Sequence, residues 1–141
     1  MDLKKQKIKQ ALKYNRNSDK RSLSIFKKLI SNEPNDVVLN SLYGISLFNF
    51  DMEKEAIQYL EKAIKIGSKA ELVYLTLYLC YVKDELYDKA IEILSKYLDK
   101  HPAKLFKTTL EELLTDLKNG YATKYKDKIH YYAKKNNIKI C

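Results

Sequence analysis

The sequence is poor in the residues that make turns, which argues against a fold with many strands. Its 141 residues include only 3 glycines and 2 prolines, and these two residue types are the strongest markers of turns between strands. Leucine, lysine, glutamate and alanine, which favour helices, dominate most of the chain. The composition therefore predicts an all-α protein.

Cysteine is also scarce, and the apolar runs are short. The two cysteines, Cys80 and Cys141, are not spaced as a CxxC pair, so we expect neither a disulfide framework nor a redox role. Cys80 lies in an apolar run and should be buried, whereas Cys141 should be a free thiol. The longest near-apolar stretch, 72–82, is far shorter than the ~20 residues of a membrane-spanning helix. No apolar run follows the lysines near the N-terminus, so no signal peptide is expected and the predicted compartment is the cytoplasm.

The net charge of +9 is concentrated at the two ends of the chain. Residues 1–21 and 121–141 are strongly basic, and the segment between them is nearly neutral. Near the C-terminus, tyrosines alternate with lysines in a pattern that suits single-stranded nucleic acid; the lysines are Lys124, Lys126, Lys128, Lys134 and Lys135. Two interpretations stay open. The basic ends bind a polyanion or an anionic surface, or they are solvated helix ends, and one face with Tyr121, Tyr125, Ile129 and Tyr132 docks a final helix.

The sequence repeats itself with a period of about 34 residues. A helix of ~12 residues, a turn and a second such helix fill one period. Two kinds of position recur at this spacing. One holds a small residue, at Ser22, Ala56 and Ala90, and the other holds a large apolar residue, at Phe26, Leu60 and Leu94.

Residues 36–104 should contain four antiparallel helices in two hairpins. We place the first two helices at about 36–50 and 53–66, and the last at about 87–100, where Pro102 ends it. Ala56, Leu60, Ala90 and Leu94 should be buried between these helices.

The motifs of the two central units are those of one known family. The chain reads Asn40-x2-Tyr43-Gly44-x2-Leu47, then Ala56-x3-Leu60 and Ala63; the next unit reads Tyr74-x2-Leu77-Tyr78-x2-Tyr81, then Ala90-x3-Leu94 and Pro102. This resembles the tetratricopeptide repeat (TPR) family, with its W-x2-L-G-x2-Y, A-x3-F, A and P signature. Asn40 stands in the place of the tryptophan, Tyr78 in that of the glycine and Tyr97 in that of the second alanine. The bulky Tyr78 predicts looser helix spacing in its unit.

The resemblance implies a single all-α domain over 1–141, a helix-turn-helix repeat solenoid of about three TPR-like units with a closing helical pair. Its parts are a weak first repeat (3–36), a second repeat (37–70), a third repeat (71–104), degenerate capping helices (105–135) and a frayed tail (136–141).

No pattern of catalysis, cofactor binding or metal binding is present in the sequence. Phosphate-binding glycine loops and the G-x-S-x-G motif are absent. His101 and His130 are far apart and have no neighbouring ligand set, and the adjacent Glu111 and Glu112 point about 100° apart on a helix. We therefore expect no enzyme activity, no cofactor and no metal.

The family resemblance implies a binding role. In TPR proteins the first helix of each unit lines a concave surface that holds a partner segment, and one sub-type clamps a carboxylate with Lys and Asn. The matching positions here are mostly apolar, which argues against that sub-type; they are Val38, Ser41, Ile45, Phe48, Leu72, Leu75, Leu79 and Val82.

The sequence thus predicts an adaptor or scaffold module that binds a protein or an amphipathic or apolar peptide segment in an apolar groove. The groove is covered by the terminal helices of the chain, by a second copy in a homodimer, or by another protein. Binding of nucleic acid or an anionic surface through the basic ends is one alternative, with less weight on nucleic acid. A chaperone of a secreted or assembling partner is another.

Overall fold

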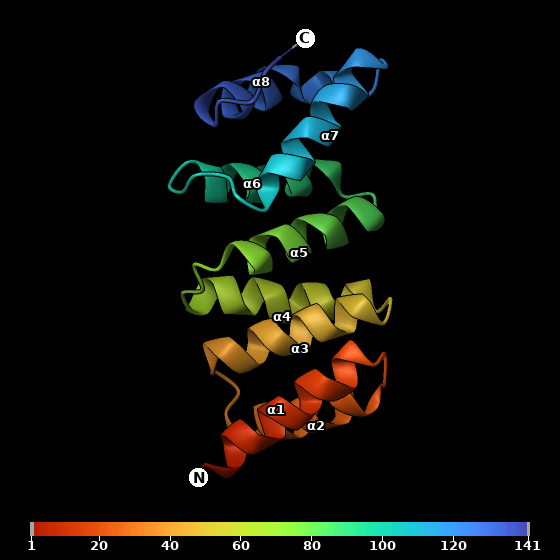
Figure 1. The fold of residues 1–141 in the computed structure, drawn as a ribbon, viewed down its shortest axis with the longest axis vertical. Coiled ribbons are helices and arrows are strands. Elements are labelled where there is room, and N and C mark those ends of the chain that lie inside the picture. The colour runs from red at the N-terminus through yellow and green to blue at the C-terminus, as the bar shows by residue number, and fades with distance from the viewer. Residues whose placement is uncertain (1, 141) are drawn as a thin grey trace.

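The protein is an elongated stack of helices (Figure 1). The structure is a computed structural model that describes residues 2–140, and within this range it contains eight α-helices and one 3-10 helix. The all-α prediction is therefore confirmed. In chain order the elements are α1 (Leu3–Arg16), α2 (Arg21–Asn32), α3 (Val37–Asn49), α4 (Glu53–Ile66), α5 (Glu71–Lys83), α6 (Tyr87–Leu98), α7 (Phe106–Lys118), η1 (Thr123–Tyr125) and α8 (Lys126–Lys135).

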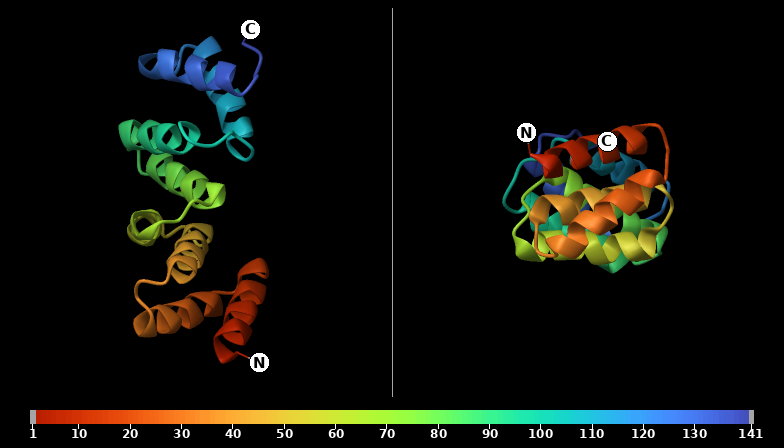
Figure 2. Two further views of the ribbon diagram at one scale, coloured as in Figure 1. Left: turned by 90° about the vertical axis from the view of Figure 1, so that its left-hand side faces the viewer. Right: turned by 90° about the horizontal axis from the view of Figure 1, so that it is seen from below.

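The helices pack as consecutive pairs, α1 with α2, α3 with α4, α5 with α6, and α7 with α8. Between pairs, α2 packs on α3 and α4 packs on α5, while α3 and α5 also touch. The two termini lie at opposite ends of the stack (Figure 2). This arrangement is consistent with a helical hairpin repeat, and the four helices expected in 36–104 are α3 to α6.

The residues that recur in the sequence form the core. Ala56 and Leu60 are completely buried, and Ala90 and Leu94 are 1% exposed, as predicted. The tyrosines on the inner faces of α3 and α5 are buried as well: Tyr43, Tyr74, Tyr78 and Tyr81. Residues that recur every ~34 positions in the sequence thus occupy the same packing position in successive helix pairs.

Gly44 allows α3 and α4 to approach closely. A Cβ atom at this position would lie 2.7 Å from both Cγ and Cδ2 of Leu60 and 3.3 Å from its backbone nitrogen. Non-bonded carbon atoms optimally lie about 3.5–4.0 Å apart. Leu60 of α4 therefore occupies the space that a side chain at position 44 of α3 would need.

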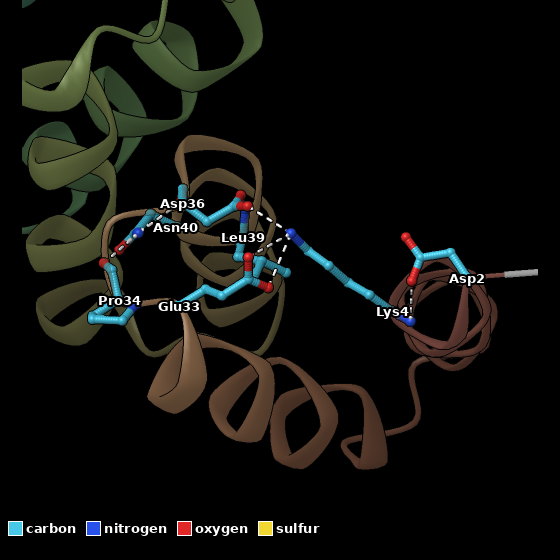
Figure 3. A network of polar contacts seen from close by, with 7 residues as sticks. All are labelled: Asp2, Lys4, Glu33, Pro34, Asp36, Leu39 and Asn40. Carbon is cyan, nitrogen blue, oxygen red and sulfur yellow. Dashed lines mark hydrogen bonds and ion pairs between the residues drawn. The ribbon is translucent and has the colours of Figure 1, made fainter.

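A polar network joins the first two pairs (Figure 3). Asp36 caps α3 by accepting the N–H of Leu39 at 2.9 Å, and it also accepts from Lys4 Nζ of α1 at 2.8 Å. Lys4 Nζ donates in addition to Glu33 at 3.1 Å. Buried Asn40 donates its amide to the carbonyls of Pro34 and Asp36, at 3.0 and 2.8 Å. Asn40 therefore holds the 33–36 loop in place.

The turns inside the pairs share one backbone feature. Ser18, Asp51, Glu85 and Gly120 follow α1, α3, α5 and α7, and their φ angles are 55°, 61°, 60° and 87°. This left-handed conformation is easy for glycine and costs other residues about 1 kcal/mol or more. A similar turn therefore reverses the chain in each pair.

The closing pair is fastened to the rest by α7. Phe106, at the start of α7, places its ring centroid 6.0 Å from that of Tyr78 and 5.7 Å from that of Tyr97. A carboxylate oxygen of Glu71 accepts the backbone N–H groups of Lys104 and Phe106, both at 2.9 Å. Glu71 of α5 thus caps the amino end of a helix more than 30 residues away.

The last helix docks on the end of α6. Tyr132 donates its hydroxyl to Asp99 at 2.6 Å, Lys135 Nζ donates to the Leu98 carbonyl at 2.9 Å, and the Asn136 side chain accepts the N–H of Ala103 at 2.7 Å. The docking role predicted for Tyr132 is confirmed.

The predicted single face from Tyr121 to Tyr132 is wrong at its start. Ala122 has a φ of 56°, and η1 separates it from α8, which begins only at Lys126. Tyr121 is consequently 68% exposed and does not dock the helix. Cys80 is buried as predicted; Cys141 lies outside the described residues.

Candidate functional site

The predicted groove residues lie on α3 and α5, two helices that touch along the stack. Three of them are exposed: Val38 (57%), Leu72 (48%) and Leu79 (38%). Ile45, Phe48, Leu75 and Val82 are half-buried. We call these seven residues the apolar face.

Ser41, the remaining predicted groove residue, is buried. Its hydroxyl donates to the carbonyl of Val37 at 2.7 Å, one turn earlier in the same helix. A ligand would therefore meet the methylene of Ser41 and the apolar neighbours of this residue rather than a free hydroxyl group.

Helix α5 is apolar nearly all round because it has neighbours on several sides. It packs against α3, α4 and α6, and Tyr78 contacts Phe106 of α7. These neighbours bury Val73, Tyr74 and Leu77. Leu72 and Leu79 are exposed and are not buried by these neighbouring helices. Packing within the chain therefore does not explain why these two residues are apolar.

A hollow of about 390 Å³ adjoins the apolar face at the start of α3. Val37, Val38, Ser41 and Leu42 form one wall, and the 67–70 loop before α5 forms the other. The exposed Val38 therefore lies at the edge of a depression and not on a flat helix surface.

The terminal helices leave the three exposed side chains of the apolar face uncovered. They form the two ends of the stack (Figures 1 and 2). Val38, Leu72 and Leu79 are exposed to solvent even though the terminal helices are part of the structure. Of the three coverings considered from the sequence, covering by the chain itself is thus not seen at these three side chains.

The five lysines predicted to contact polyanions differ in their surroundings. Lys124 Nζ lies 3.0 Å from an Asp88 carboxylate oxygen, and this hydrogen bond raises the pKa of Lys124. Lys135 is held by the carbonyls of Leu98 and Asp99. All five lysines are exposed, as is Tyr131 beside them. The three lysines not described above are Lys126, Lys128 and Lys134.

The described residues contain no cluster of three or more His, Cys, Asp and Glu side chains placed to hold a metal ion. Among the helices of residues 2–140, none combines the length and the apolar character needed to cross a membrane. Comparison of the sequence with protein-family models and with curated proteins gives no match.

Proposed function

We propose that this protein is a TPR-type binding module, an adaptor or scaffold whose apolar face binds an amphipathic segment of another protein. The observation that carries the proposal is the exposure of Val38, Leu72 and Leu79 on adjacent first helices of two consecutive pairs. Chaperone activity toward an assembling partner would use the same surface, and a cytoplasmic location is part of the proposal.

Three features support the TPR assignment. The helices pack in sequential pairs, similar left-handed turns recur in the pairs, and Gly44 meets Leu60 where the family motif has glycine and a large apolar residue. Asn40 departs from the motif, but its buried amide fixes the loop before α3. The departure changes how the position is filled and leaves the hairpin intact.

Burial of the exposed side chains would favour binding. Complete burial of a valine or leucine side chain gains about 1.5–3 kcal/mol, so covering one that is about half exposed gains roughly 1 kcal/mol. Three such contacts support a weak complex, because association itself has a substantial entropic cost. We therefore expect a partner segment that also reaches the half-buried Ile45, Leu75 and Val82.

The charge of the chain favours a different protein over a second copy. A net charge of +9 makes two copies repel each other, although the apolar face itself lies in the nearly neutral central segment. We therefore propose an amphipathic segment of a different protein, and not a second copy, as the occupant of the apolar face.

The test is selection of peptides from a random library on the immobilised protein, followed by affinity measurements with the selected peptides. The variant L72E/L79E should lose binding, because both side chains are exposed and their replacement leaves the core intact. The matched control is L3E/L105E, which makes the same change at two exposed leucines outside the apolar face.

Three results would contradict the proposal. Peptides that bind L72E/L79E as well as the unchanged protein would show that another surface is used. Equal loss in L3E/L105E would point to a general charge effect. Dimers that turn monomeric in L72E/L79E would show that a second copy is the occupant.

A second candidate function is polyanion binding through α8. Exposure of Lys126, Lys128 and Lys134 on the same helix as the exposed Tyr131 supports it. It has less support than the apolar face, because Lys124 and Lys135 already have partners within the chain. The dependence of binding on salt separates the two functions, since phosphate contacts weaken steeply as salt rises.

A further inference from the structure

A second hollow, of about 400 Å³, lies beyond the carboxyl end of the apolar face. Val82 of α5 belongs to its lining, together with residues of α6, α7 and the segment before α8. We call it the aromatic cleft, because four of the residues that line it are tyrosines: Tyr78, Tyr87, Tyr121 and Tyr125. Its volume is within the range of small-molecule sites.

The cleft exists because α7 is anchored at its start. Phe106 contacts the rings of Tyr78 and Tyr97, whereas Leu113 and Asp116, in the last two turns of α7, line the open cleft. The strained Ala122, with its φ of 56°, then turns the chain so that Tyr121 and Tyr125 border the same space.

The chemistry of the lining is unusual for so basic a protein. Of the described residues that line the cleft, none is Lys, Arg or His, and Asp116 is the one charged residue. Apolar atoms of Ala90, Ile91 and Leu113 supply much of the remaining wall. The cleft thus combines aromatic rings, apolar walls and one carboxylate.

We propose that the aromatic cleft binds a small organic cation, an ammonium group carried on an apolar body. The faces of tyrosine rings attract cations through their quadrupole, and the Asp116 carboxylate supplies the opposite charge. An anion would be repelled by Asp116. The proposal does not depend on a partner at the apolar face.

The surroundings of the cleft agree with this assignment. Burial raises the pKa of Tyr78 to about 12, and the nearby negative charges of Asp116 and Glu112 add to this effect. At the rim, Lys124 Nζ lies 5.6 Å from the ring centroid of Tyr125 while Asp88 pairs with it. Lys124 thus lies within cation–π distance of one ring that lines the cleft, and Asp88 balances the charge of this lysine.

The experiment compares choline with 3,3-dimethylbutan-1-ol, which has the same shape but carbon in place of the charged nitrogen. Both are titrated into the full chain up to ~50 mM, well above the millimolar dissociation constant that a small ligand would have, and backbone amide shifts are followed by NMR. We expect choline to shift the amides of Ala90, Leu113 and Ala122 and to bind at least about fivefold more tightly than the alcohol.

Two variants test the named groups. D116N should remove the preference for choline, and Y121L, which changes a 68% exposed side chain, should weaken choline binding while the fold is kept. The matched control D127N removes the same charge from an exposed residue of α8 outside the cleft. It should leave both affinities unchanged.

Each opposite result overturns the proposal. Equal affinity for choline and the alcohol would mean that the cleft is only an apolar hollow. An effect of D127N as large as that of D116N would mean that overall charge, and not the cleft, attracts the cation. Absence of shifts at the three amides in the unchanged protein would mean that the cleft does not bind cations.

Discussion

Replacement of Gly44 by alanine tests the packing of α3 on α4 at a single atom. The new Cβ would lie 2.7 Å from Cγ and Cδ2 of Leu60, and Leu60 is fully buried. Overpacking of this kind costs about 1–3 kcal/mol. Alanine is better than glycine in a helix by about 1 kcal/mol. The two effects leave a net loss of about 1 kcal/mol in the free energy of unfolding.

The same substitution should have the opposite sign when Leu60 is shortened. L60A alone should cost about 2–5 kcal/mol, because it leaves a cavity in the core. In that background the 2.7 Å contacts of the new methyl group with the Leu60 side chain are gone, and only the 3.3 Å approach to the backbone nitrogen stays. Most of the helix gain of about 1 kcal/mol therefore remains. The double variant G44A/L60A should therefore be more stable than L60A, with a coupling energy of about 2 kcal/mol.

Equilibrium unfolding in urea, followed by far-ultraviolet circular dichroism, measures the four free energies of this cycle. The slopes with denaturant must agree among the variants, since helical stacks do not always unfold in one step. If G44A stabilises both backgrounds, or if the two changes add to within about 0.5 kcal/mol, the close approach of α3 and α4 is not as described.

Four other perturbations test separate parts of the structure. L94A should cost about 2–5 kcal/mol in the same assay, and a cost below about 1 kcal/mol would contradict the burial of Leu94. E71A removes the acceptor at the start of α7, so it should destabilise the closing pair by about 1 kcal/mol. Amide hydrogen exchange should then become faster in α7 and α8 but not in α3, and an equal increase in all three helices would refute this. Burial raises the pKa of Tyr78 from 10.0 to about 12, so ionisation of Tyr78 should not affect the free energy of unfolding below pH 10 and should lower it between pH 10 and 12; Y78F should make that fall smaller. Neutralising Lys126, Lys128 and Lys134 of α8 should abolish retention on heparin at low salt. If the unmodified protein is not retained either, the polyanion function is refuted.

The helices of the two central pairs could be predicted closely from the sequence. Spaced alanines and leucines such as Ala56, Leu60, Ala90 and Leu94 occupy equivalent core positions, so the pattern carries both the helix type and the buried face. The predicted 53–66 helix has the bounds of α4, and the helix placed at 87–100 ends two residues earlier, at Leu98.

The closing pair was predicted less well because its contacts join distant residues. The left-handed Ala122 has no signature in the sequence, since alanine rarely adopts this conformation, and it moves the start of α8 beyond Tyr125. Glu71 looks like an ordinary residue of a helix start, yet it caps α7.

The candidate surfaces, like the fold, could be predicted only where the local sequence pattern determines them. The helical period identified the apolar face, but it does not report that Ser41 is buried or that Lys135 caps α6. The aromatic cleft was missed because its walls come from four separate segments. The interleaved tyrosines Tyr121 and Tyr125 were the one signal, and they were considered only as parts of a helix.

The unequal fastening of the two ends of the stack bears on how the protein opens. The first pair is joined to the remainder by the packing of α2 on α3 and by the partly exposed ion pairs of Lys4, which contribute little in water. The last pair is held by Glu71, Tyr132 and Lys135. Under mild thermal stress the stack should therefore unzip from its amino end. The resulting species would keep α3 to α8 and expose the surface of α3 that α2 covers, a fresh edge on which another stack could grow.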